Sequence, residues 1–395
     1  MKKILVYQQL KNLKPTGGPA AIGYYYATEQ ERRGDHIFEY IPDSTSYKSL
    51  HDVESQRLNR LPIFLQKLYA NIKQIVKYNI LLGFKYKQDP VDFTQYDIIH
   101  FHDTQSLYLR RYDLKKYKGK VLLQSHSPQP LGQEMLDVMP MAVKCFVPFA
   151  KKRLERMDKY AFNRADIIIF PCPEAEEPYY NRWKAYAHIH DVKKMCFRYI
   201  LTGIPSCSPK HTREEIRRML NVENDDFLIC YVGRHNVIKG YDSLKRIGQK
   251  FLENNDNAWI ICAGKETPLT KPNINRWIEI GWTSDAHSYI TASDVFVLPN
   301  KETYFDIVML EVLSLGKIVV ASRTGGNKYF ERNNCKGVFL YGIEDEAVAI
   351  LQNISRMTQT ERDYLGKQNM EFYKKNHTVS AMYEQYIKLL NCISD

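Results

Sequence analysis

Short apolar runs alternate with turn residues and helix-compatible stretches along the chain, and this alternation constrains the fold more than any other feature. The second half holds four such runs, at residues 227–232, 259–263, 294–298 and 317–321. A turn residue such as Gly233 or Pro299 follows, and then a helical segment. Units of this kind pair their strands in a parallel sheet that helices cover on both faces. The sequence therefore predicts a doubly wound α/β domain in this half.

The first half repeats this pattern, with apolar runs at residues 4–7, 36–41, 97–101, 120–124 and 165–170. Between the halves, residues 202–209 are rich in Gly, Pro and Ser, as linkers are. A chain of 395 residues that is 44% hydrophobic can bury two cores. We therefore expect an N-terminal Rossmann-like domain over 1–202 and a C-terminal one over 203–377. Ligands of such sheets bind at the carboxyl ends of the strands, so the two domains should face each other across a cleft.

Charge and cysteine usage narrow the partner and the compartment. The net charge of +11 indicates an anionic partner: a phosphorylated molecule, an acidic lipid surface or nucleic acid. The eight cysteines form no Cys-x-x-Cys pair and are interpreted as reduced core thiols. No apolar window is long enough to span a membrane, and the Met-Lys-Lys start leads into a strand rather than a signal peptide, so we expect a cytoplasmic protein. His100 with His102, and His188 with His190, lack a second pair at zinc spacing, so no metal site is predicted.

Residues 298–326 carry the densest chemistry: a strand, a polar turn, a helix, another strand and Gly-Gly. Glu311 lies one helical turn from Ile307, so we expect it at a buried surface, where its charge needs a partner. The helix that begins near Asp306 points its N-terminal amides toward the predicted cleft, where they can bind an anion. A ligand with a phosphate at the helix N-terminus and a ribose at Glu311 fits this pattern. A structural arginine is the alternative partner.

A second segment, residues 231–241 (YVGRHNVIKGY), delivers two cations to the carboxyl end of a predicted strand. Arg234 offers a planar fork and Lys239 a point charge, which together suit a diphosphate. The alternative is that both are surface cations without a role.

Two features of the first half also lie after predicted strands. Gly17 and Gly18 open a helix and allow a ligand close to the backbone, although a glycine pair is also common in ordinary turns. His126 follows the run 120–124 and so lies at a carboxyl end, where a histidine can be structural or can bind a ligand.

Two further segments break the strand-helix pattern. Residues 57–88 combine apolar residues at helical spacing with basic ones and contain no acid, which suits either a helix on an anionic membrane or an ordinary packed helix. We expect residues 129–163 to form a long loop and a helix near the cleft. We interpret Met135, Met139 and Met141 within it as packing residues rather than as an acceptor-binding surface.

Together these segments resemble the retaining, nucleotide-sugar-dependent glycosyltransferases of family 4, which belong to glycosyl transferases group 1 and have the GT-B fold of two Rossmann-like domains. The matching motifs are GGPA, DIIHFHD, LQSHS, ADIIIFPCP, YVGRHNVIKGYDSL, FVLPN and VMLEVLSLGKIVVASRTGG. The resemblance implies that Arg234 and Lys239 hold the diphosphate of a nucleoside diphosphate sugar and that Glu311 binds its ribose. It also implies that residues 378–395 form a helix that packs back on the first domain.

The resemblance assigns the remaining site residues as well. Phe305, Asp306 and Ile307 would line the donor sugar and phosphates through their backbone amides. The loop at Gly17 and Gly18 would approach the transferred sugar, and His126 would contact its hydroxyls near the reaction centre.

The sequence departs from the family at one position. The family usually shows two glutamates separated by seven residues, yet aligning Phe305 and Asp306 with its Phe-Gly puts Thr303 at the first of them. Glu302 lies one residue early. Either Glu302 still reaches the sugar as a catalytic-site residue or Thr303 replaces it, and both alternatives affect which donor sugar is bound.

The resemblance implies sugar transfer with retention, from a UDP- or GDP-linked donor to a glycan or lipid-linked acceptor in bacterial surface polysaccharide synthesis. Stabilisation of the leaving diphosphate by Arg234 and Lys239 lessens the need for a metal, and the chain has no Asp-x-Asp pair. No cofactor is expected. A nucleotide-sugar epimerase of the same fold and a non-catalytic nucleotide-sugar or glycan-binding protein are the alternatives, and no motif indicates nucleic-acid binding. Peripheral contact with the inner face of the plasma membrane is expected.

Overall fold

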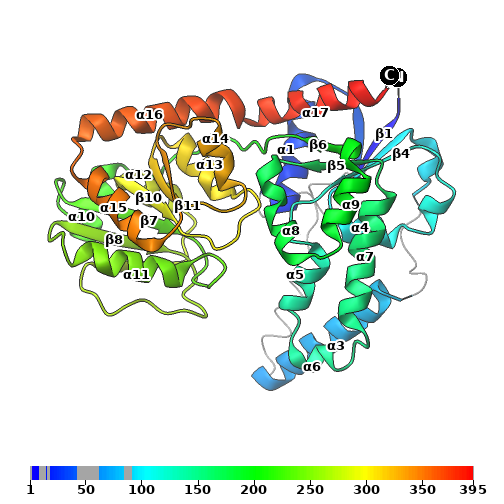
Figure 1. Ribbon diagram of the computed structural model, residues 1–395, viewed down its shortest axis with the longest axis horizontal. Helices are drawn as coiled ribbons and strands as arrows, with labels where there is room; N and C mark the ends of the chain where they lie inside the picture. The colour runs from blue at the N-terminus through cyan, green and yellow to red at the C-terminus, as the bar shows by residue number, and fades with distance from the viewer. Residues whose placement is uncertain (1, 9–14, 16–17, 42–61, 84–90, 395) are drawn as a thin grey trace. The chain divides into compact units, whose positions relative to one another are not determined.

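The computed structural model describes residues 2–8, 15, 18–41, 62–83 and 91–394 (Figure 1). The chain divides into two compact units. The first comprises Met1–Phe170, Tyr179–Tyr199 and Cys392–Asp395, and the second comprises Pro171–Pro178 and Ile200–Asn391. The predicted Gly17 lies outside the described residues, and Gly18 is the first residue of helix α1.

The first unit is built on a six-stranded parallel sheet. Its strand order is β2-β1-β3-β4-β5-β6, so the order reverses between β1 and β3. The strands are β1 (Ile4–Tyr7), β2 (Phe38–Ile41), β3 (Ile98–Phe101), β4 (Lys120–Gln124), β5 (Ile167–Phe170) and β6 (Phe197–Tyr199). The helices are α1 (Gly18–Arg33), α3 (Ile63–Leu81), α4 (Thr104–Leu109), α5 (Leu131–Asp137), α6 (Met141–Lys144), α7 (Ala150–Arg164), α8 (Glu177–Arg182) and α9 (Tyr186–Val192).

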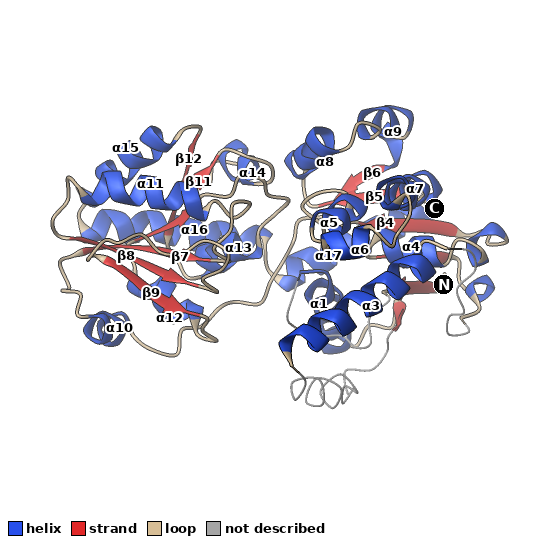
Figure 2. Cartoon of the chain, turned by 90° about the horizontal axis from the view of Figure 1, so that it is seen from below, coloured by secondary structure: helices blue, strands red, loops and turns tan. Residues whose placement is uncertain are grey.

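The second unit holds a second six-stranded parallel sheet, in the order β12-β11-β10-β7-β8-β9. Its strands are β7 (Phe227–Val232), β8 (Ala258–Ala263), β9 (Trp277–Gly281), β10 (Val295–Leu298), β11 (Ile318–Ser322) and β12 (Val338–Tyr341). Its helices are α10 (Arg213–Leu220), α11 (Tyr241–Leu252), α12 (Ala286–Ala292), α13 (Ile307–Ser314), α14 (Asn327–Arg332), α15 (Glu344–Ser355), α16 (Gln359–Asn376) and α17 (Val379–Ser394). Helices α11 and α15 cover one face of the sheet, and α12, α13 and α16 cover the other (Figure 2).

The two sheets confirm the prediction of two doubly wound α/β domains. The central strands are apolar throughout because both of their faces are buried, as in β5 and β10. Helix α17 occupies the predicted C-terminal stretch; its residues up to Asn391 cluster with the second unit, and the last four residues of the chain cluster with the first. No helix within the described ranges is long and apolar enough to cross a membrane.

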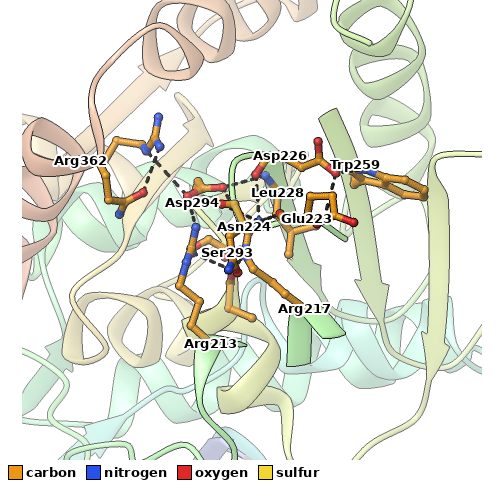
Figure 3. A network of polar contacts seen from close by, with 12 residues as sticks. Arg213, Arg217, Glu223, Asn224, Asp226, Leu228, Trp259, Ser293, Asp294 and Arg362 are labelled. Carbon is orange, nitrogen blue, oxygen red and sulfur yellow. Dashed lines mark hydrogen bonds and ion pairs between the residues drawn. The ribbon is translucent and has the colours of Figure 1, made fainter. Parts of the chain in front are cut away.

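A buried network of ion pairs joins α10 to the sheet of the second unit (Figure 3). The Asp294 carboxylate, just before β10, accepts bonds from Arg213 Nη2 at 2.7 Å and from Arg217 Nη2 at 2.8 Å. Arg217 is 1% exposed and also donates to the backbone oxygens of Glu223 at 2.6 Å and Asp226 at 2.9 Å. All these partners satisfy a guanidinium that burial would otherwise leave uncompensated.

Two expectations about the core need correction. Four of the eight free cysteines are buried, but Cys145 and Cys392 are exposed, so the interpretation of every cysteine as a core thiol is wrong. Met135 and Met139 are buried as expected, whereas Met141 is 75% exposed. Met141 is the first residue of the short helix α6, in which Val143 is the residue that packs inward.

Candidate functional site

The loop between β7 and α11 carries both predicted cations of the second unit. The loop is held at its start because Tyr231 Oη donates to the Arg234 carbonyl oxygen at 2.9 Å. Near its end, the Lys239 amide donates to Asn236 Oδ1 at 2.8 Å. Gly240 follows with φ +68°, and a Cβ there would lie 1.7 Å from the Pro299 carbonyl oxygen. Only glycine allows the loop to approach the chain beyond β10 this closely.

Lys239 is paired with Asp306, although 67 positions separate them in the chain. Its Nζ lies 2.8 Å from Asp306 Oδ1 and 2.7 Å from Oδ2. The amide of the fully buried Asn300 donates to the same carboxylate. Asp306 occupies the N-cap position of α13, but its side chain does not cap the helix amides. The predicted phosphate-binding lysine is therefore neutralised by an internal carboxylate at the start of the predicted anion-binding helix.

Helix α13 presents one partly exposed stripe. Met309, Leu310, Val312 and Leu313 are fully buried, whereas Ile307, Val308 and Glu311 are partly exposed. Glu311 is 28% exposed, so the expectation of a buried carboxylate is wrong. The helix is apolar on nearly all sides, and its packing against α12, α16 and β11 decides which side is covered. Glu311 shares the uncovered stripe with Ile307, one turn away.

The partner of Glu311 in the protein is His287, whose Nε2 lies 3.8 Å from Glu311 Oε1. Contacts with the Cys207 thiol and with Glu311 raise the pKa of His287 to about 10, so the imidazole is cationic at neutral pH. A cationic histidine therefore offsets the charge of Glu311. The partner predicted from the sequence was a ligand or an arginine.

Glu302 and Thr303 are neighbours in the turn between β10 and α13, but they differ in exposure. Thr303 is buried, and its carbonyl oxygen accepts a bond from the Gly326 amide at 3.4 Å. A Cβ on Gly325, whose φ is +44°, would lie 1.9 Å from that oxygen. Glu302 is the more exposed of the pair. The role of each at the donor sugar remains a prediction.

The ring of Phe305 belongs to a buried aromatic cluster. It stacks on Phe330 at a centroid distance of 5.5 Å and lies 5.7 Å from both Tyr329 and His377. This packing occupies the side chain, so the backbone is the part of Phe305 left to meet a ligand. The cluster thus holds Phe305 two residues before α13 begins.

The loop between β7 and α11, which we call the cationic loop, packs on a further group of polar and aromatic side chains that was not predicted from the sequence. His235 stacks on Tyr241 at 3.9 Å with an interplanar angle of 6°. Tyr241 Oη and Trp277 Nε1 both donate to the Glu279 carboxylate, the latter at 2.9 Å. Burial raises the pKa of Glu279 and lowers the pKa of His235. The position of His235 beside Arg234 is the only signal in the sequence that could have indicated it.

In the first unit, His126 lies after β4 as predicted, in a group of three histidines. Its Nε2 is 3.1 Å from His102 Nδ1, and the two rings stack at 5.1 Å. The ring centroids of His100 and His102 are 4.4 Å apart. Burial lowers the pKa of His126 and of His100 to about 3 and that of His102 well below its usual range. All three are neutral at pH 7, so His126 can exchange hydrogen bonds with hydroxyls but brings no charge.

The structure separates the predicted residues into two groups. Arg234, Lys239, Asp306 and Glu311 all come from loops and helices that follow β7 or β10 in the second unit, whereas His126 and Gly18 belong to the first. Among the residues that the structure describes, no group of three His, Cys, Asp or Glu side chains is placed to hold a metal ion.

Sequence comparison places the cationic loop and α13 within a family match. Residues 226–360 match the model of the family glycosyl transferases group 1. An uncharacterized glycosyltransferase of Methanocaldococcus jannaschii is 27% identical over 143 residues, 34% of this chain and 36% of the relative. A UDP-Gal:alpha-D-GlcNAc-diphosphoundecaprenol alpha-1,3-galactosyltransferase of Escherichia coli is 27% identical over 139 residues, 32% of this chain and 36% of the relative. The alignments thus span about a third of each relative.

Solved structures resemble the chain over its whole length. Sucrose-phosphate synthase from Thermosynechococcus elongatus has a TM-score of 0.62 at 18% identity and covers 100% of this chain and 99% of its own. Anabaena HepE in complex with UDP-glucose has a TM-score of 0.62 at 16% identity, covering 99% and 100%. At this identity the likeness shows the fold alone. The predicted GT-B fold and the resemblance to glycosyl transferases group 1 are confirmed, and the narrower assignment to family 4 stays a prediction.

Proposed function

We propose that the chain is a retaining glycosyltransferase that transfers a sugar from a UDP- or GDP-linked donor to a glycan or lipid-linked acceptor in bacterial surface polysaccharide synthesis. One observation carries this proposal. Within the segment that matches glycosyl transferases group 1, the cation Lys239 meets the N-terminal end of α13, and Arg234 lies on the same loop. Two cations and a helix N-terminus form a site for a diphosphate.

The remaining residues extend this site toward the nucleoside. Glu311 lies on the partly exposed stripe of α13, one turn beyond the helix start at Ile307. A carboxylate at that distance can accept hydrogen bonds from ribose hydroxyls when phosphate lies at the helix N-terminus. Glu311 would then contact His287 on one side and the ribose of the donor on the other.

The proposed mechanism is electrostatic. Negative charge develops on the diphosphate as it leaves the sugar, and fixed cations and amides stabilise that charge in the transition state. No covalent intermediate is required, and Arg234 and Lys239 take the role that a metal would otherwise have. His126, neutral at pH 7, would hold a sugar hydroxyl by a hydrogen bond.

Two comparisons support the choice of substrates. The name of the E. coli relative gives UDP-Gal as donor and a diphosphoundecaprenol-linked sugar as acceptor. HepE has been solved with UDP-glucose. A UDP-sugar and a lipid-linked acceptor are therefore the first substrates to test, and peripheral membrane contact forms part of the proposal.

The direct test is to incubate the full chain with UDP- and GDP-sugars and acceptor lipids, and to determine the anomeric configuration of the product by NMR. We expect release of nucleoside diphosphate, an α-linked product from an α-linked donor, and the same rate with and without EDTA. A β-linked product would contradict retention, and loss of turnover in EDTA that added Mg²⁺ restores would contradict metal independence. An altered free nucleotide sugar would favour the epimerase instead.

Replacing Asp306 with asparagine should increase the affinity for free nucleoside diphosphate about tenfold, on the order of 1.4 kcal/mol. Asp306 competes with the phosphates for Lys239, and a neutral amide keeps the bond to Asn300 without that competition. Titration calorimetry measures the change. The matched control is Asp345→Asn, which breaks a surface pair with Lys250. Weaker binding by Asp306→Asn would show instead that this carboxylate helps to hold the donor.

A further inference from the structure

Two acid-free segments come together on one surface of the first unit. Residues 62–83 and 138–153 contain no Asp or Glu, and the structure places α3 from the first segment against α6 from the second (Figures 1 and 2). Asn79 Nδ2 donates to the Phe146 carbonyl oxygen at 3.1 Å, and Arg153 Nη1 donates to Asn79 Oδ1 at 3.2 Å. Beneath them, Tyr78 and Val143 belong to one buried apolar cluster. The two segments therefore form a single face, which we call the α3–α6 face.

Large apolar side chains project from the α3–α6 face. Phe64 on α3 is 67% exposed, and Phe149 beyond α6 is 80% exposed. The exposed apolar residues are Ile63, Phe64, Leu68, Tyr69, Ile72, Val76, Val138, Met141, Phe146 and Phe149. Single exposed apolar residues are ordinary, but so many on adjoining elements mark an interaction surface.

Phe149 adds an independent observation. Its φ of +56° places a bulky residue in the left-handed region, where glycine is normally found. Burial of the ring does not offset the cost of this backbone conformation, because the ring is exposed. The backbone therefore holds an apolar ring outward at the junction before α7.

The charges of the α3–α6 face are all positive. Lys67, Lys73 and Lys77 are exposed on α3, and Lys151 and Lys152 are exposed at the start of α7. Lys73 Nζ lies over the Tyr69 ring at 5.9 Å, so a basic group and an apolar ring are in contact on this face. A basic, apolar helix that lies along a surface is typical of binding to anionic lipid.

We propose that the α3–α6 face docks the first unit on an anionic lipid bilayer, with its apolar side chains in the interfacial layer and its lysines at the headgroups. A second copy of the chain is a poor occupant, because a symmetric contact would bring the lysines of one copy against those of the other. The proposal deepens the proposed function and rests on it, since it names the surface and the lipid charge for the membrane contact proposed there. Vesicle binding in the absence of donor tests it apart from the donor site.

The test is flotation of the full chain with vesicles of phosphatidylcholine alone and of phosphatidylcholine with phosphatidylglycerol, in the absence of donor. We expect binding only to the anionic vesicles. Each lysine near a lipid surface contributes about fivefold to partitioning, so Lys67→Gln, Lys73→Gln and Lys77→Gln combined should lower it about a hundredfold. Phe149→Ser should also lower it, which tests the second segment separately.

Two matched controls lie in the second unit. Lys250→Gln removes an exposed lysine, and Trp282→Ser removes an apolar side chain that is 78% exposed. Both should bind as the unmodified chain does. Equal binding to both kinds of vesicle, or unchanged binding by the triple lysine variant, would overturn the proposal. So would a dimer in light scattering that Phe149→Ser abolishes while vesicle binding persists. Thermal shift with nucleoside diphosphate, measured on the same variants, reports the donor site separately.

Discussion

Arg234→Ala and Lys239→Ala are each expected to lower kcat/KM for sugar transfer at least about a hundredfold, the size of effect that follows removal of one preorganised group from an oxyanion site. Gly240 and the Tyr231 bond hold the backbone of the loop that carries both residues, and the Lys239 Nζ already lies at the start of α13 before the donor binds. Because the diphosphate charge grows as the sugar leaves, we expect kcat to fall more than the affinity for the donor.

Steady-state release of nucleoside diphosphate measures this effect. Arg246→Ala is the matched control, because Arg246 is an exposed arginine on α11 whose partner is Glu344. It should retain full activity. Activity within about threefold of the unmodified chain in both Arg234→Ala and Lys239→Ala would remove these residues from the mechanism.

Arg217→Ala is expected to destabilise the second unit by about 3–5 kcal/mol, since it removes one cation from a buried ion-pair network and leaves Asp294 with Arg213 as its partner on α10. Arg217 and the Asp294 side chain are both 1% exposed, and the guanidinium also holds backbone oxygens in the turn before β7 (Figure 3). The variant therefore loses several hydrogen bonds together with the charge pair.

Urea unfolding followed by tryptophan fluorescence measures this loss, since Trp259 and Trp277 lie in the second unit. Arg218→Ala is the control: Arg218 is the next residue of the same helix and is exposed. A difference of less than about 1 kcal/mol between the two variants would show that Arg213 and water compensate for the loss of Arg217 beside Asp294.

The sequence could predict the buried strands because a strand covered on both faces is apolar throughout. The expected runs coincide with β1, β4 and β7 and lie within two residues of the other strands that were predicted. The three strands that were missed, β6, β9 and β12, are all at sheet edges. Edge strands pair on one side only. Polar residues interrupt β6 and β9, at Arg198 and Glu279, so no continuous apolar run identifies these two strands. Strand β12 is a short apolar run, VFLY, and was overlooked.

The candidate site could be predicted where it depends on position along a strand-turn-helix unit. Arg234, Lys239 and the start of α13 follow predicted strands directly, which explains why they were found. The pairing of Lys239 with Asp306 joins two such units, and only the folded sheet brings β7 beside β10. The exposure of Glu311 depends on which neighbours cover α13, and the α3–α6 face depends on packing between segments about 70 residues apart. No local pattern encodes these contacts.

Calorimetric titration of the full chain with UDP and with GDP is the most direct test of a diphosphate-binding donor site in the second unit. We predict binding of at least one of them with a stoichiometry of one, and its loss when Arg234 and Lys239 are both replaced by alanine. Binding of neither nucleotide, or equal binding by the double variant, would contradict the assignment of the site.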